Sequence, residues 1–133
     1  MLQKIVVLTT LGESDTPLIQ CGIRVAAVFS KELCLFYQAA GADHSLHLDH
    51  QLEEIRHRLQ QEIPGLPVSA MVAPFRGERL ATTLADEHEA IMIIAGASHF
   101  RQLAQSLQSS PIPFLFVNEK APFVSDFRKI VFP

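Results

Sequence analysis

The sequence IMIIAGASHFRQLAQSLQSS occupies residues 91–110 and joins an apolar run to a glycine turn and then to a Gln-rich stretch. The unbroken apolar run from Ile91 to Ala95 predicts a strand that is covered on both faces. Gly96 follows at once, and a glycine lets backbone N–H groups approach an anion closely. A helix that begins behind such a turn adds its dipole to the same point. We therefore expect a strand that leads into an anion-binding turn.

Short apolar runs and segments of helical period alternate along the rest of the chain. Strands are predicted at residues 5–8, 33–37, 68–73, 91–95 and 114–117, and helices at about 15–30, 45–63, 77–88 and 99–108. Asp15 or Ser14 is expected to cap the first helix, in which Pro17 lies early. Because a parallel sheet is buried by helices on both faces, this order predicts an α/β fold with a five-stranded parallel sheet.

Composition and charge exclude several classes of protein. The chain has 133 residues, of which 48% are apolar and 19% charged, and its formal net charge is −3. Its Lys and Arg residues form no run, so binding to nucleic acid or to an anionic membrane is not expected. The N-terminus lacks the layout of a secretion signal, and we expect a cytoplasmic protein. Cys21 and Cys34 lie in segments predicted to be core, as free thiols.

The densest group of metal-ligand side chains lies near residue 47, at Asp43, His44, His47, Asp49 and His50. At helical spacing His47 and His50 lie three residues apart and could share a metal ion. His50, however, points away from the apolar stripe that begins at Leu48 and Leu52, which is the solvated side of a surface helix. We therefore expect no metal site.

Catalytic residues are not expected either. Ser98 and His99 are adjacent in sequence and so do not obviously face each other, and no Gly-x-Ser-x-Gly turn surrounds the serine. The sequence therefore favours a protein that is not an enzyme.

The end of the chain resembles its beginning. Lys129-Ile130-Val131-Phe132 follows the pattern of Lys4-Ile5-Val6-Val7, 125 positions earlier (129 − 4). One interpretation is a domain at residues 1–120, followed at 121–133 by a linker and the first strand of a second copy in a tandem protein. The alternative is chance, since a Lys before β-branched or aromatic residues is common where strands begin.

Three segments together give the chain a resemblance to a universal stress protein domain over residues 3–118. They are Lys4 to Leu8, like that family's opening strand, Gly77 to Gly96, like its helix and strand before a glycine loop, and Pro113 to Val117, like its closing strand. The resemblance implies a Rossmann-like sheet in the order 3-2-1-4-5 with about four helices. It also implies a ligand cleft at the carboxyl ends of strands one and four, where the strand order of an open α/β sheet reverses.

The family's nucleotide-binding members share a pattern of G-x-x-G, nine residues, then G-S or G-T, and this chain follows that pattern incompletely. Aligned from Gly96, it has His99 and Ser109 at the two later glycine positions, and it keeps the final hydroxyl at Ser110. At the end of the first strand those members carry an acidic residue, whereas this chain has Thr10. The loop is therefore degenerate by comparison.

Two functions follow from the resemblance. The first is a non-catalytic stress-response or regulatory domain that needs no cofactor. It acts through a homodimer or through pairing with a second domain of the same chain, along its last strand at Phe114 and Phe116. The alternative is an ATP- or AMP-binding domain, with or without slow hydrolysis of the bound nucleotide. The ligand-binding residues would then be Thr9, Thr10, Gly96, Ser98 and Ser110.

Overall fold

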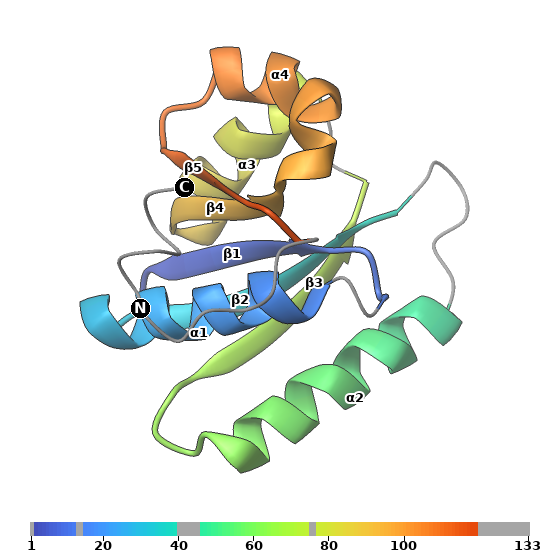
Figure 1. Ribbon diagram of the computed structural model, residues 1–133, viewed down its shortest axis with the longest axis vertical. Helices are drawn as coiled ribbons and strands as arrows, with labels where there is room; N and C mark the ends of the chain where they lie inside the picture. Colours follow the sequence, from blue (N-terminus) through green and yellow to red (C-terminus); the bar gives the residue numbers. More distant parts are fainter. Residues whose placement is uncertain (1, 13–14, 40–45, 75–76, 120–133) are drawn as a thin grey trace.

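The computed structural model describes residues 2–12, 15–39, 46–74 and 77–119, and the structural statements below refer to these residues. Strands and helices alternate along this part of the chain (Figure 1). In chain order they are β1 (Lys4–Thr9), α1 (Thr16–Phe29), β2 (Glu32–Gln38), α2 (Leu46–Glu62), β3 (Val68–Ala73), α3 (Glu78–His88), β4 (Ala90–Gly96), the 3-10 turn η2 (Ala97–His99), α4 (Phe100–Gln108) and β5 (Phe114–Val117). The predicted strands and helices are all confirmed, with ends that differ by one or two residues in most cases. The expected second-copy strand at 121–133 lies outside the described residues and stays a prediction.

The five strands form one parallel sheet in the order β3-β2-β1-β4-β5, as the resemblance implied. From β1 the chain first builds outward through β2 and β3, and then returns to the other side of β1 with β4 and β5. The carboxyl ends of β1 and β4 therefore lie beside each other at the point where the order reverses.

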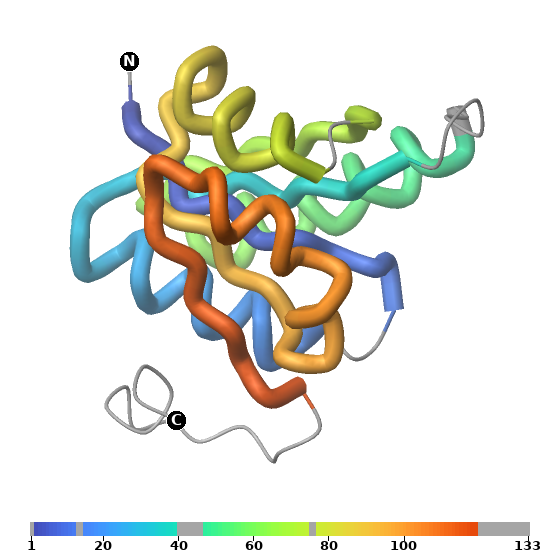
Figure 2. The backbone as a smooth tube through the Cα atoms, turned by 90° about the horizontal axis from the view of Figure 1, so that it is seen from above, coloured from blue at the N-terminus to red at the C-terminus, as the bar shows by residue number. Residues whose placement is uncertain are grey.

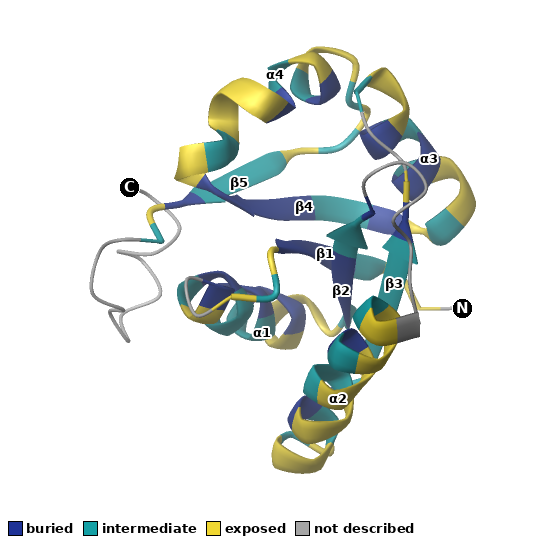
Figure 3. Cartoon of the chain, turned by 90° about the vertical axis from the view of Figure 1, so that its right-hand side faces the viewer, coloured by how far each residue is buried: buried dark blue, intermediate teal, exposed yellow. Residues whose placement is uncertain are grey.

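Helices cover the sheet on both faces, α1 and α2 on one and α3 and α4 on the other (Figures 1 and 2). Successive residues of a strand point to opposite faces. In β1, Ile5 and Val7 join the core under α1 and α2, whereas Val6 and Leu8 join the core under α3 and α4. The central strands are thus apolar at almost every position, and Figure 3 shows them buried between exposed helix surfaces.

Helix α1 lies close on the sheet because it carries a glycine at the contact. A Cβ atom added to Gly22 would lie 2.5 Å from Cγ2 of Val7 and 2.9 Å from Cδ1 of Leu33. Cys21, the preceding residue, and Cys34 in β2 are both buried free thiols, as predicted.

Candidate functional site

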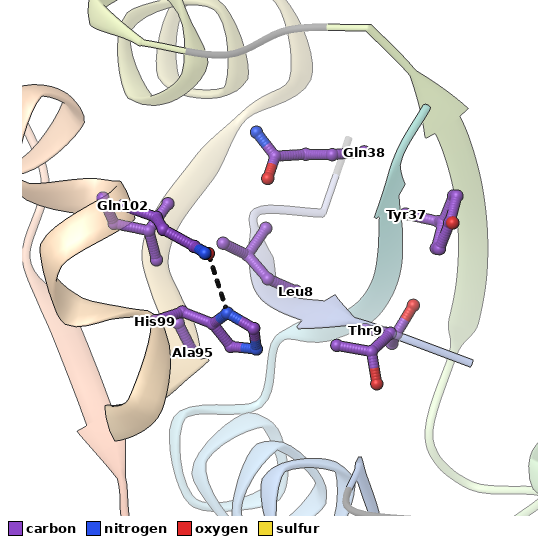
Figure 4. A pocket seen from close by; sticks show the side chains of 9 residues that line it. Leu8, Thr9, Tyr37, Gln38, Ala95, His99 and Gln102 are labelled. Atoms are coloured by element: carbon purple, nitrogen blue, oxygen red, sulfur yellow. Dashed lines mark hydrogen bonds between the residues drawn. The ribbon is translucent and has the colours of Figure 1, made fainter. Parts of the chain in front are cut away.

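A cavity of about 510 Å³ opens at the carboxyl end of the sheet (Figure 4). Its lining comes from the ends of β1, β2 and β4, from the residue after β1, and from η2 and α4: Leu8, Thr9, Thr10, Tyr37, Gln38, Ala95, His99, Gln102 and Leu103. This is the end of the sheet at which the order of strands reverses, where α/β folds generally bind ligands. The volume is within the usual range for small-molecule sites.

The polar lining of the cavity consists of hydroxyl and amide groups and one imidazole, without a carboxylate, lysine or arginine side chain. The hydroxyl of Thr9 donates to the carbonyl of Phe36 at 3.3 Å. Nδ1 of His99 lies 2.9 Å from Oε1 of Gln102 (Figure 4), and because an amide oxygen only accepts, Nδ1 carries the proton. In the neutral ring Nε2 of His99 is then a hydrogen-bond acceptor.

Beside the cavity, the turn after β1 is organised by the carboxylate of Asp15. The backbone N–H of Thr10 donates to both of its oxygens at 2.9 and 3.0 Å, and the hydroxyl of Thr10 donates to one of them at 2.8 Å. The N–H of Leu11 donates to the other at 2.9 Å. Asp15 is 4% exposed. It stands at the N-cap position of α1, as predicted, but its side chain makes no capping bond to the helix and turns back to the preceding loop.

The turn after β4 carries a second carboxylate, from Glu119. The backbone N–H of Ser98 donates to Oε1 of Glu119 at 3.1 Å, and the hydroxyl of Ser98 donates to Oε2 at 2.9 Å. Gly96 makes room for this contact, since an added Cβ would lie 1.7 Å from Oε2. Partial burial works to raise the pKa of Glu119, but the hydrogen bonds from Ser98 outweigh it and hold the pKa below its ordinary value.

Both turns next to the cavity therefore hold an anion that belongs to the chain itself. Asp15 accepts from the turn after β1, and Glu119 accepts from the turn after β4. A phosphate brought to either turn would have to displace a carboxylate from its donors, and would be repelled by it until then. As the structure stands, the cleft offers a ligand a cavity with both polar and apolar lining residues, flanked by two carboxylates.

The structure brings four of the five nucleotide-site candidates to this region. Thr9 and Thr10 line the cavity, and Gly96 and Ser98 form the adjacent turn. Ser110 lies elsewhere, in the turn between α4 and β5, where its hydroxyl accepts from the N–H of Ile112 at 3.1 Å.

The separation of Ser110 has a simple cause. Residues 100–108, nine in number, are the helix α4 and not a loop. A helix of that length separates its two ends by about 13 Å, at 1.5 Å per residue. The degenerate pattern therefore does not close around one ligand in this chain.

Several residues of the site were not singled out from the sequence. Tyr37 and Gln38 could have been found from the rule that the carboxyl ends of parallel strands line the cleft, since they end β2. The same rule points to Glu119, two residues beyond the end of β5. Gln102 gave no signal, because it becomes a lining residue only through the position of α4.

The two aromatic residues predicted for an interface lie on β5, an edge strand of the sheet. Their rings are used within the domain: Phe114 stacks on Phe116 at a centroid distance of 5.8 Å, and Phe116 meets the ring of Phe100 edge to face at 5.0 Å. Phe114 and Phe116 are half-buried, and Phe100 is 48% exposed. An aromatic cluster thus reaches the surface beside the edge strand.

The histidine-rich segment is only partly described. Asp43 and His44 lie outside the described residues, and within those residues no group of three or more His, Cys, Asp or Glu side chains is placed to hold a metal ion. His50 forms an exposed pair with Glu54 on α2, at 3.1 Å. Among the described helices, none is long and apolar enough to cross a membrane.

Comparison with known proteins identifies the fold. No protein-family model matches the chain, and no curated protein matches it. Among solved structures, it is similar to a universal stress protein in complex with cAMP, with a TM-score of 0.63 and 20% identity over 90% of this chain and 98% of that one. It is also similar to the universal stress protein from Archaeoglobus fulgidus in complex with dAMP, with a TM-score of 0.66 and 12% identity over 86% and 95% of the two chains. A third structure, also of a universal stress protein from Archaeoglobus fulgidus, gives a TM-score of 0.63 and 14% identity over 84% and 90%. The chain has the universal stress protein fold.

Proposed function

We propose that the chain is a non-catalytic regulatory domain of the universal stress protein type, which acts by pairing and does not bind nucleotides through their phosphates. The observation that carries this proposal is the carboxylate of Glu119 on the N–H and hydroxyl of Ser98. A phosphate bound at the turn after β4 would compete for those donors, which the chain fills itself.

The hydroxyl of Ser98 and one ring nitrogen of His99 are committed to other partners. The hydroxyl of Ser98 donates to Glu119, and Nδ1 of His99 bonds Gln102. A serine nucleophile needs a base within hydrogen-bond reach, and here its partner is an acceptor whose pKa lies below the ordinary value, which makes it a weak base. This arrangement supports a binding function over hydrolysis.

Pairing is supported by the edge of the sheet. β5 pairs with β4 on one side, and no described strand pairs with its other side. An edge strand presents backbone donors and acceptors to a further strand, and the cluster of Phe100, Phe114 and Phe116 places apolar surface beside that edge. The partner we propose is a second copy of this domain, on another chain or in tandem on the same one.

The second candidate is nucleotide binding without the full loop. It is favoured by the cavity of about 510 Å³ and by the cAMP and dAMP complexes of the two similar structures. Thermal unfolding with and without millimolar ATP and Mg²⁺ separates the candidates. We expect no change in the midpoint, whereas a rise of several degrees, as a ligand far above its Kd produces, would overturn the proposal in favour of nucleotide binding.

Pairing is tested by sedimentation of the wild type and of two matched variants. Phe116→Lys places a charge on the β5 edge, and Met71→Lys places the same charge on β3, the opposite edge of the sheet. Both side chains are half-buried and pack against the same core cluster, so Met71→Lys controls for the cost of a half-buried charge, and thermal unfolding shows that both variants are folded. We expect the wild type to self-associate and only Phe116→Lys to lose this; a monomeric wild type, or equal losses in both variants, would contradict pairing through β5.

A further inference from the structure

We infer that the turn from Gly96 to Ser98 is an anion site held shut by the chain's own Glu119, and that displacing this carboxylate opens the site to a small phosphate monoester. The inference rests on the proposed function and deepens it, because it explains why the domain does not bind phosphates and says what would restore that ability.

The turn has the construction of an anion site. Two donors of Ser98, one from the backbone and one from the side chain, converge on one carboxylate at 3.1 and 2.9 Å. The residue before Ala97 is a glycine, and any side chain there would occupy the position of Oε2 of Glu119. The backbone of Gly96 is extended, with φ −70° and ψ 140°, so glycine is not required by its conformation. The space above it is what the glycine provides.

The two internal carboxylates differ in how firmly they are held. Asp15 is buried at the start of α1. Its carboxylate accepts from the N–H and hydroxyl of Thr10 and from the N–H of Leu11, four and five positions before it in the chain. Glu119 is half-buried, and the described hydrogen bonds to its carboxylate come from Ser98, 21 positions away, in a contact that is exposed to solvent. Asp15 is thus part of the fold, whereas Glu119 can leave without disturbing a helix or strand.

Glu119 can keep other anions away from this turn because the chain holds its carboxylate beside it. Glu119 follows the end of β5 by two residues, so its carboxylate cannot move far from the turn. A group held in this way competes at an effective concentration on the order of millimolar or more. A free phosphate must exceed that concentration and must also approach a negative charge.

The position of the turn indicates what class of ligand the open site would take. Ala95 precedes the turn and His99 follows it, and both line the cavity of about 510 Å³. A phosphate on Ser98 would therefore have its organic group directed to a space of small-molecule size, with Nε2 of His99 as one available acceptor. Phosphate monoesters of small polar molecules meet both requirements, whereas inorganic phosphate uses only the turn.

Calorimetric titration with AMP and with inorganic phosphate tests the inference on four proteins. They are the wild type, Glu119→Ala, the control Glu87→Gln, and the double variant Gly96→Ala/Glu119→Ala. Glu87 is exposed near the C-terminal end of α3, which precedes the opposite end of the sheet, so its variant removes a negative charge away from the turn. In the double variant the new methyl group fills the space that the anion would enter. Thermal unfolding of each protein confirms that it is folded.

We expect Glu119→Ala to bind AMP at least about tenfold more tightly than the wild type, a change of about 1.4 kcal/mol. Glu87→Gln should behave as the wild type, and the double variant should lose the gain. Inorganic phosphate should show the same order with weaker binding. Equal affinity of the wild type and Glu119→Ala, whether both bind or neither does, would overturn the inference. Tight binding of AMP by the wild type would overturn the proposed function, whereas binding by neither protein would overturn the inference alone, so the two failures are distinguishable.

Discussion

Replacing Asp15 with alanine is expected to destabilise the domain strongly, because the change leaves the turn after β1 without its acceptor. The lost carboxylate accepts from the N–H of Thr10, the hydroxyl of Thr10 and the N–H of Leu11. Hydrogen bonds to a charged group contribute about 1.5–3 kcal/mol each. Thr10 is exposed, however, and water can replace part of what it loses. We therefore expect a loss of about 2–4 kcal/mol in the free energy of unfolding, less than the sum of three bonds.

For a chain of this length each kcal/mol lowers the unfolding midpoint by about 3–4 °C, so the expected fall is about 7–15 °C. Urea denaturation followed by circular dichroism measures the free energy, and calorimetry measures the midpoint. Two further variants divide the loss. Asp15→Asn keeps one acceptor oxygen and should cost about half as much. Thr10→Val removes only the bond from the hydroxyl, and should cost at most about 1.5 kcal/mol.

The result that would refute this reasoning is a cost below about 1 kcal/mol for Asp15→Ala, the level of one ordinary neutral hydrogen bond. It would mean that the turn after β1 holds its shape without the carboxylate. A double-mutant cycle between Asp15→Ala and Thr10→Val gives a second check. The two changes remove the same bond, so their effects should not add.

Three other changes test the packing and the charges. Gly22→Ala should lower the free energy of unfolding, measured by urea denaturation, by about 1–2 kcal/mol. The new methyl group would meet Val7 at 2.5 Å, and this crowding costs more than alanine gains in helix propensity. A stabilised variant would show that α1 can move off the sheet. NMR titration of the Glu119 carboxyl should give a pKa below the ordinary range of glutamate. Its contact with Ser98 then stabilises the fold at neutral pH, and this stabilisation is lost as the pH falls through the lowered pKa. A midpoint at or above the ordinary value would contradict the contact. Burial raises the pKa of the Cys21 thiol to about 11, so at pH 8 an alkylating reagent should label Cys21 only as fast as the domain unfolds. Mass spectrometry of the Cys21 peptide measures this rate, and fast labelling of the native domain would contradict the prediction.

The fold could be predicted from the sequence because its signals are local. Apolar runs such as Leu33 to Phe36 mark buried strands, and the period of Leu52 and Leu59 marks the face of α2 that packs on the sheet. The order of the strands is not a local property. It came from the resemblance to a family, and the sheet confirms it.

The site could be predicted only in part, since its contacts join distant residues. Ser98 and Glu119 are 21 positions apart, and their contact depends on how β5 returns to the sheet beside β4. Ser110 lies apart from the other candidates for the opposite reason. Its position in a motif was counted along the chain, but the intervening residues form α4 and carry it away from the turn.

The turn after β1 shows why a comparison by position alone gives an incomplete picture of this cleft. The nucleotide-binding pattern implies an acidic residue at the end of the first strand, and this chain has Thr10 there. An acidic group is nevertheless present at this turn, because the carboxylate of Asp15 accepts from both the N–H and the hydroxyl of Thr10. Its oxygens accept from the backbone and the hydroxyl of this turn, and Asp15 is not among the residues that line the cavity. Glu119 does the same at the turn after β4. The chain therefore keeps the two turns that flank the cleft in this fold and satisfies their donors from within, so that what it can bind depends on which of the two carboxylates can be moved.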